Sequence, residues 1–251
     1  SIVRILYGVC GEGMGHATRS NAVIECLLQH GHEVHIVAAG RAYDFLAPKY
    51  ESVHKIKGFH LVYDSNSLSN AKSLMHILKD LPKDFRPSLR TMASVIRTVR
   101  PQVIISDFEV FTSLLGNLLG IPIIAANNIS IIDKTKVNVK KASLLYPQLF
   151  AWTTARLATL RADHFIIPTF FFPRIKNKRT TLTHPVVRTA VRMLKPRIGK
   201  HVLIYQTSPT CLGLLHTLHD LPEKFVVYGY GERPTEKNLT FYPFNETTFL
   251  D

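Results

Sequence analysis

Apolar and polar positions follow two patterns along this chain: short continuous apolar runs, and longer segments with apolar residues at helical spacing. The run Ile2–Val9 predicts a buried strand, and the spacing over 21–30 predicts a helix that ends at Gly31. Because strands and helices continue to alternate, we expect a parallel, doubly wound α/β sheet. Further strands are expected at 33–39, 51–56, 59–63, 103–106, 121–126 and 164–167, and further helices at 41–47, 67–81, 85–99, 112–119 and 143–160.

A segment rich in proline and basic residues interrupts this alternation. It includes Pro173, Pro185 and the basic run 174–179, and we interpret 169–198 as a connection between domains. Strand and helix patterns then begin again, with strands expected at 201–205, 225–228 and 239–242 and a helix at 211–219. Since a doubly wound domain typically has ~100 residues or more, we expect the second domain to be incomplete in this sequence. The expected organisation is a first Rossmann-like domain over 1–168, a linker over 169–198, and the first part of a second Rossmann-like domain over 199–251.

The most informative segment is the glycine-rich sequence GEGMGHATR at 11–19, between the first strand and the first helix. Open α/β sheets bind ligands at such turns, because glycines allow close backbone approach and the N–H groups that begin a helix attract anions. His16 stands at the mouth of the turn, within reach of a bound substrate. The dinucleotide fingerprint does not fit, because counting from Gly11 the third glycine falls one residue early, at Gly15. We therefore predict a ligand site that does not bind nicotinamide.

The chain is strongly basic, with a formal net charge of +13. Such a charge favours acidic partners, among them nucleic acid, anionic lipid headgroups and sugar nucleotides. The basic residues are spread along the chain without an RNA-binding signature, so nucleic acid is not expected. The 3 cysteines have no C-x-x-C spacing, which fits a reducing cytoplasm, and the 12 histidines show no metal-ligand spacing, so no metal site is expected.

Two stretches suggest contact with a membrane surface. No apolar run reaches the ~18 residues of a spanning helix, but Leu144–Leu160 carries Arg156 as its one charge. Further along, 170–172 is a run of three phenylalanines directly before the basic run 174–179. Aromatic residues beside cations suit an anionic bilayer surface. The alternative is a buried helix followed by a packed linker, so a cytoplasmic location, either free or peripheral at the inner face of the membrane, is expected.

The segment 11–19 resembles the N-terminal loop of the GT-B glycosyltransferases, and in particular MurG-like enzymes and prokaryotic glycosyltransferase-related proteins that open with G-E-G-x-G-H-x-x-R. The resemblance continues, less clearly, through 104–109. MurG itself has a different glycine arrangement before its histidine, so a MurG-type acceptor does not follow. The residues that match the motif are Gly11, Glu12, Gly13, Gly15, His16 and Arg19.

The resemblance implies the transfer of a sugar from a nucleotide-diphosphate sugar donor to a hydroxyl acceptor. The acceptor would be a sugar or a lipid-linked molecule of cell-envelope or polysaccharide synthesis. Such enzymes generally need no metal to bind the diphosphate, and no cofactor is expected. A histidine base would favour inversion at the sugar carbon. The alternatives are a sugar-nucleotide epimerase or hydrolase on the same fold, and a sugar-nucleotide-binding protein without catalysis.

His16 and Asp107 are the expected catalytic pair. A histidine suits the removal of a proton from a hydroxyl, and it acts best when a carboxylate fixes its tautomer. Asp107 ends the strand 103–106, whose carboxyl end should lie at the same edge of the sheet as that of the first strand. The resemblance to plant-type GT-B enzymes implies the same pair. The alternatives are that His16 is a capping or loop residue and that Asp107 caps the following helix.

Other polar residues are expected to line the two substrate sites. Glu12 and Glu109 are alternative bases if His16 instead contacts phosphate. Arg19 either contacts an anionic group of the acceptor or lies on a solvated helix face, and Asn127 and Asn128 either hydrogen-bond an acceptor sugar or form a plain turn. The expected acceptor site consists of Gly13, Gly15, Arg19, Glu109, Asn127 and Asn128, and the expected donor site of the hydroxyls of Thr207 and Ser208.

Overall fold

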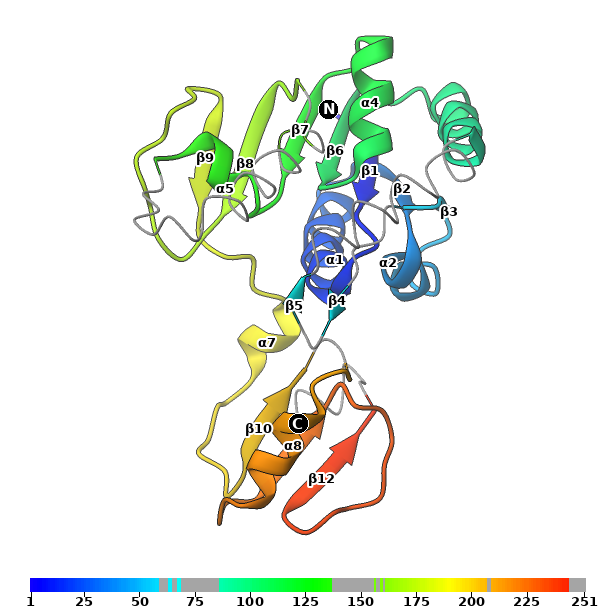
Figure 1. Cartoon of the computed structure of the whole chain (residues 1–251). Helices are drawn as coiled ribbons and strands as arrows, with labels where there is room; N and C mark the ends of the chain where they lie inside the picture. The colour runs from blue at the N-terminus through cyan, green and yellow to red at the C-terminus, as the bar shows by residue number, and fades with distance from the viewer. Residues whose placement is uncertain are drawn as a thin grey trace. The chain divides into compact units, whose positions relative to one another are not determined.

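In the computed structural model the described residues are 1–58, 63–64, 67–68, 86–136, 156, 159, 161–206 and 209–243. The chain divides into two compact units. The first consists of Ser1–His60 and Leu74–Arg188, and the second of Leu61–Ser73 and Thr189–Asp251. A seven-stranded sheet forms the centre of the first unit, and a three-stranded sheet lies in the second (Figure 1).

The seven-stranded sheet is parallel throughout, as the alternation of strands and helices predicts. Its order is β3-β2-β1-β6-β7-β8-β9, so the chain builds outward from β1 in one direction and then from β6 in the other. This arrangement confirms the doubly wound α/β fold. The strands are β1 (Arg4–Val9), β2 (Glu33–Ala38), β3 (Val53–Lys55), β6 (Val103–Asp107), β7 (Ile123–Ala126), β8 (His164–Pro168) and β9 (Thr180–Thr183).

Helices cover both faces of this sheet. On one face α1 (Gly13–Gln29) and α2 (Gly40–Leu46) pack against β1 and β2, around residues such as Ile24 and Ile36. On the other face lie a helix over 86–99 and α4 (Val110–Leu119). A short helix, α5 (Ile131–Lys134), follows β7. Two-sided coverage explains why the strands of this sheet are nearly continuous apolar runs.

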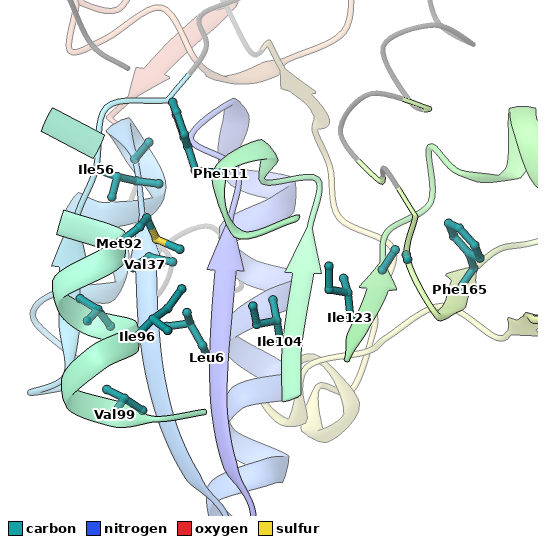
Figure 2. Close-up of a cluster of buried hydrophobic side chains, with 14 of the residues drawn as sticks. Leu6, Val37, Ile56, Met92, Ile96, Val99, Ile104, Phe111, Ile123 and Phe165 are labelled. Atoms are coloured by element: carbon teal, nitrogen blue, oxygen red, sulfur yellow. The ribbon is translucent and has the colours of Figure 1, made fainter. Parts of the chain in front are cut away.

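The largest apolar cluster lies between the sheet and the helix 86–99 (Figure 2). Met92 on that helix and Leu6, Ile104 and Ile123 on three neighbouring strands are all less than 2% exposed. Burying one side chain of this size contributes about 1.5–3 kcal/mol. The cluster therefore fixes β1 and β6 side by side, which is the arrangement that the polar residues at their ends require.

The second unit repeats the strand-helix alternation on a smaller scale. β10 (Val202–Tyr205), β11 (Phe225–Tyr228) and β12 (Leu239–Tyr242) form a parallel sheet, and α8 (Leu212–His219) follows β10. Leu215 and Leu218 of α8 pack with Val227 of β11 in a separate apolar cluster. The strands and the helix that the sequence predicts here are confirmed.

Two expectations differ from the structure. The expected linker 169–198 contains β9, the seventh strand of the first sheet, and a short helix, α7 (Thr189–Met193). β-Branched residues dominate Thr180–Thr183, and they favour a strand, but the neighbouring prolines and basic residues obscured that signal. The expected helix 67–81 is contradicted at its start, because β5 (Ser67–Leu68) pairs antiparallel with β4 (Tyr63–Asp64). The rest of 67–81 lies outside the described residues, as does 143–160 apart from 156 and 159.

Within the described ranges, no helix combines the length and the apolar character needed to cross a bilayer.

The close approach of β1 and α4 yields a prediction about stability. A Cβ added to Gly8 would lie 2.5 Å from both Cγ2 and Oγ1 of Thr112, a stiff, fully buried side chain. We expect Gly8→Ala to lower the free energy of unfolding by about 1–3 kcal/mol through overpacking. In the double variant Gly8→Ala/Thr112→Ala the loss should be smaller than the sum of the two single losses, because the clash is removed. If the two single losses simply added in urea unfolding, the contact with Thr112 would not be what restricts residue 8 to glycine.

Candidate active site

The candidate site lies where the order of the strands reverses. β1 and β6 are neighbours, with Val9 paired to Asp107, and the backbone N–H of Cys10 donates to the carbonyl of Asp107 over 3.1 Å. From β1 the sheet extends to β2 on one side, whereas from β6 it extends to β7 on the other. Ligands of open α/β sheets bind outside the carboxyl ends of the strands at this reversal. Asp107, the last residue of β6, therefore stands where a ligand is expected.

The glycine-rich segment is partly helical, which corrects the expected helix start. α1 begins at Gly13, whose φ is +73°, and not at Asn21. The sequence pattern missed this first part because glycines are poor helix formers and because the segment has no apolar periodicity. His16 and Arg19 thus lie three residues apart on one face of the first turns of α1.

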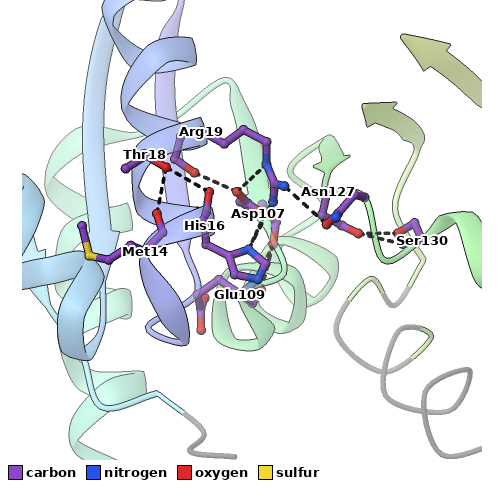
Figure 3. A network of polar contacts seen from close by, with 12 residues as sticks. Met14, His16, Thr18, Arg19, Asp107, Glu109, Asn127 and Ser130 are labelled. Carbon is purple, nitrogen blue, oxygen red and sulfur yellow. Dashed lines mark hydrogen bonds and ion pairs between the residues drawn. The ribbon is translucent and has the colours of Figure 1, made fainter. Parts of the chain in front are cut away.

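The carboxylate of Asp107 is the centre of a polar network that joins α1 to β6 (Figure 3). Its Oδ1 lies 2.8 Å from Nδ1 of His16 and accepts from Nη2 of Arg19 over 2.5 Å. Its Oδ2 accepts from Nε of Arg19 over 3.2 Å and from Oγ of Ser20 over 2.9 Å. The expected pairing of His16 with Asp107 in space is therefore present, and Arg19 joins it.

The surroundings of Asp107 keep it ionised. Its side chain is completely buried, and burial by itself would raise its pKa. The hydrogen bond and the charge of His16, followed by those of Arg19, outweigh burial and hold the pKa of this carboxyl below its usual value. A buried charge of this kind is stable only while these donors remain in place.

The ionised carboxylate fixes the tautomer of His16. Because ionised Asp107 only accepts hydrogen bonds, the proton between it and His16 belongs to Nδ1. Nη2 of Arg19 lies 3.2 Å from the same Nδ1, so two donors converge on one carboxylate oxygen. In the neutral ring Nε2 then carries the lone pair, which is the form that a general base requires.

Two residues of the site were not predicted from the sequence. Ser20 follows Arg19 on α1 and donates to Asp107, a role that its position suggests only once the helix is known to begin at Gly13. Phe108 has a positive φ of 59°, which is rare for a bulky residue, and its ring stacks on that of His16 with centroids 6.1 Å apart. Strained backbone of this kind often marks functional sites.

Glu109 has a different place from the one expected. Its side chain caps α4, with Oε1 accepting from the N–H of Phe111 over 3.0 Å and Oε2 accepting from the N–H of Thr112 over 2.6 Å. Burial raises its pKa, although these amide hydrogen bonds act in the opposite direction. The capping role considered for Asp107 thus belongs to Glu109, whose carboxylate is buried and occupied by backbone amides.

Asn127 and Asn128 follow β7 at the same edge of the sheet. Oδ1 of Asn128 accepts from Nη1 of Arg19 over 3.3 Å, so this side chain borders the network. Asn127 is buried, and its Oδ1 accepts from both the backbone N–H and the hydroxyl of Ser130, each over 2.9 Å. Within the described part of the chain its buried Nδ2 has no hydrogen-bond partner.

Thr207 and Ser208, the expected donor-binding residues, lie outside the described residues. Gly13 and Gly15 are placed at the start of α1, and a Cβ at either would meet no atom within 4 Å. No group of three or more His, Cys, Asp or Glu side chains among the described residues is arranged to hold a metal ion.

Comparison with known proteins identifies a family. Residues 3–251 match the family described as glycosyl transferase family 1. An uncharacterized glycosyltransferase of Methanosarcina acetivorans is 23% identical over 217 residues, which cover 82% of this chain and 55% of the relative. Another, from Methanosarcina mazei, is 29% identical over 122 residues, which cover 48% of this chain and 31% of the relative. The matched segments thus span about half or less of the length of these relatives.

Solved structures agree with this fold. The glycotransferase of kitacinnamycin superposes with a TM-score of 0.62 at 16% identity, covering 96% of this chain and 71% of that one. UGT89C1 of Arabidopsis thaliana, solved with UDP-L-rhamnose, superposes with a TM-score of 0.58 at 12% identity, covering 99% of this chain and 72% of that one. The expected GT-B-like fold is therefore confirmed, while the role of the segment 11–19 stays a prediction.

The network around Asp107 yields a prediction about stability and its pH dependence. At pH 7 we expect Asp107→Asn to lower the free energy of unfolding by about 3–5 kcal/mol, because the guanidinium of Arg19 loses its buried counter-charge. A lowered pKa means that the stabilisation by Asp107 is complete above its ordinary value of about 3.9 and is lost as the pH falls through the lower value of the folded state. The difference between wild type and variant in urea unfolding should therefore shrink below pH ~4.

Asp163→Asn is the matched control for this measurement. Asp163 is exposed, and its Oδ2 accepts from the N–H of Ile123 over 2.8 Å. A loss in this control as large as the loss in Asp107→Asn, or an Asp107→Asn variant as stable as wild type at pH 7, would contradict the account of the network.

Proposed function

The chain belongs to glycosyl transferase family 1, and from this premise we propose that it transfers a sugar from a nucleotide-diphosphate sugar to a hydroxyl acceptor with His16 as the base. The observation that carries the proposal is the 2.8 Å contact between Nδ1 of His16 and the ionised, buried Asp107 at the strand reversal. This contact leaves Nε2 in the form that accepts a proton. The site thus combines the usual ligand position of an open α/β sheet with a prepared base.

The proposed reaction is a single displacement at the anomeric carbon of the donor sugar. Nε2 of His16 takes the proton of the acceptor hydroxyl as its oxygen forms the new bond to that carbon. The bond from the carbon to the diphosphate oxygen breaks, and the nucleoside diphosphate leaves with the electron pair. Direct displacement inverts the configuration. Asp107 stabilises the positive charge that His16 acquires, since the two side chains are in contact.

Arg19 has a supporting role in this scheme. Its Nε and Nη2 donate to Asp107, and its Nη1 donates to Asn128. These bonds hold the carboxylate in place and partly neutralise it, so that Asp107 orients His16 without binding its proton too tightly. Nη1, at the border of the network, is the part of Arg19 that would reach an anionic group of the acceptor.

The acceptor would lie over the start of α1. Gly13 and Gly15 leave open space beside the backbone there, which allows close approach of a substrate. Asn128, at the border of the network, is the amide that would hydrogen-bond acceptor hydroxyls, whereas the side chain of Asn127 is buried and holds Ser130. On the donor side, the hydroxyls of Thr207 and Ser208 would contact the diphosphate, as the resemblance to GT-B enzymes implies.

The acceptor class and the location follow from the same resemblance and from the cysteines. The acceptor would be a hydroxyl of cell-envelope or polysaccharide synthesis, and the diphosphate would be held without a metal. Cys10, Cys26 and Cys211 are all free thiols, which is typical of a reducing compartment. Burial raises the pKa of the Cys10 thiol to about 12, which disfavours the thiolate that a nucleophilic cysteine requires. The proposed location is the cytoplasm, either free or peripheral at the inner face of the membrane.

His16→Ala tests the base directly. We expect kcat/KM for transfer to fall about 100- to 10,000-fold, the usual contribution of a general base. The assay measures release of nucleoside diphosphate and identifies products by mass spectrometry over a panel of nucleotide sugars and acceptors. His30→Ala, at the exposed end of the same helix, is the matched control and should keep full activity.

The products also separate the alternatives. Near-native transfer by folded His16→Ala would refute His16 as the base. An isomerised nucleotide sugar, or free sugar formed without an acceptor, would instead indicate an epimerase or hydrolase. Binding of nucleotide sugars by wild type without any turnover would indicate a non-catalytic protein.

Gly15→Ala tests whether a substrate approaches the start of α1. Because a Cβ there meets no protein atom, the variant should fold and gain up to about 1 kcal/mol from the better helix propensity of alanine. An acceptor bound against the helix would be displaced by the new methyl group, and kcat/KM should fall about 10- to 100-fold. Thr98→Ala, an exposed helix position away from the site, controls for helix propensity alone. Unchanged transfer by Gly15→Ala would place the acceptor elsewhere.

A further inference from the structure

The loop between β8 and β9 presents three consecutive aromatic side chains to solvent. Phe170 is 91% exposed, Phe171 58% and Phe172 54%. Ile175, a few residues later, is 39% exposed. Single exposed apolar residues are normal on a protein surface, but a contiguous group of large ones usually marks a contact with another molecule or with a membrane.

Cations follow the aromatic residues directly. Arg174, Lys176, Lys178 and Arg179 are all exposed, and the stretch 169–179 contains no acidic residue. Lys136 joins them, because its backbone N–H donates to the carbonyl of Arg174 over 2.9 Å. Among the described residues no carboxylate forms an ion pair with any of these five side chains. The loop therefore carries a concentrated positive charge beside its apolar tip.

The loop is held in a definite shape. Ile175 forms an antiparallel bridge with Thr135, and the N–H of Lys176 donates to the carbonyl of Lys134 over 2.8 Å. At the aromatic tip the hydroxyl of Thr169 donates to the carbonyl of Phe171 over 2.8 Å and accepts from its N–H over 3.3 Å. The backbone thus fixes the outward presentation of the rings.

The loop lies at the same edge of the sheet as the candidate active site. It follows the carboxyl end of β8, as Asp107 ends β6 and Asn127 follows β7, and these three parallel strands are adjacent. α5, which lies between Asn128 and the bridge at Thr135, connects the two regions (Figure 1). A surface that contacts the loop would therefore be close to the edge that holds His16.

We propose that 170–179, with Lys136, is a membrane-contact surface for anionic lipid headgroups, into which the phenylalanine side chains insert. Charge complementarity selects anionic lipid: the five cations, none of which pairs with a carboxylate in the described part of the chain, attract a negative surface, and each contributes to binding within a Debye length. A purely electrostatic partner would leave the adjacent apolar rings exposed to water. A bilayer buries them as well, since interfacial binding combines buried apolar area with charge.

The membrane-contact surface also bears on the choice of acceptor, and this step rests on the proposed function. A lipid-linked acceptor held in the bilayer would meet the protein at the edge of the sheet where His16 lies. Binding to lipid requires no turnover, so a failure of membrane binding and a failure of sugar transfer are separate results.

Vesicle sedimentation tests the surface with the full chain. Vesicles of phosphatidylcholine alone are compared with vesicles that also contain phosphatidylglycerol. Phe170→Ser/Phe171→Ser removes the apolar tip. Its matched control is Leu118→Ser/Leu119→Ser, an apolar pair that is also more than half exposed, at the end of α4 and hence at the opposite edge of the sheet. Lys178→Gln/Arg179→Gln removes charge, and its control is Arg90→Gln/Arg97→Gln on the helix 86–99.

We expect wild type to bind the anionic vesicles and to bind phosphatidylcholine about 1,000-fold or more weakly, because each of the five cations contributes roughly fivefold. The phenylalanine pair variant should lose about tenfold or more in affinity, and the charge pair variant about 25-fold, with thermal unfolding unchanged in both. Both controls should bind as wild type does. The proposal would be overturned if wild type did not bind anionic vesicles, or if the control variants bound as weakly as the test variants. It would also be overturned if binding depended on charge, did not change in the phenylalanine pair variant, and was equally strong for a single-stranded RNA.

Discussion

A buried, ionised carboxylate is the constraint on which the rest of this site depends. Asp107 is completely buried, and its charge is stable only because His16, Arg19 and Ser20 surround it with donors. All three donors belong to the first turns of α1, so the carboxylate ties the start of this helix to the end of β6. The same contact sets the tautomer of His16. The carboxylate of Asp107 therefore serves both the fold and the proposed chemistry, and removal of its charge should affect both.

The apolar core makes this arrangement possible by placing two strand ends side by side. Leu6 and Ile104 hold β1 against β6, and the absence of a side chain at Gly8 lets the first turn of α4 approach β1 through Thr112. Glu109 caps that helix, so the acidic residue nearest to Asp107 in sequence is occupied by backbone amides. Asp107 is thus left as the carboxylate that faces α1. Of these two neighbouring acids, Glu109 has a structural role and Asp107 the proposed chemical one.

Much of the fold could be predicted from the sequence, because buried parallel strands appear as continuous apolar runs and the helices between them keep their periodicity. The pattern failed where tertiary contacts overrule local preference: α1 begins among glycines because His16 and Arg19 bind Asp107, and β9 is a strand despite its proline-rich surroundings. The pairing of His16 with Asp107 could be predicted because the carboxyl ends of parallel strands share one edge of the sheet, and the resemblance to GT-B enzymes implied the same pair. The capping role of Glu109 could not, because Asp107 and Glu109 lie two residues apart at the end of β6 and only their side-chain directions distinguish them.

The central claim is that Asp107 holds the proton of the neutral His16 ring on Nδ1 and so prepares Nε2 as a base for sugar transfer. The most direct test is the nitrogen-15 NMR spectrum of His16, assigned by comparison with His16→Ala, at a pH where the ring is neutral. The account predicts that Nδ1 has the shift of a protonated nitrogen and Nε2 that of an unprotonated one, and that Asp107→Asn removes this preference. A proton on Nε2 in the wild type would contradict it.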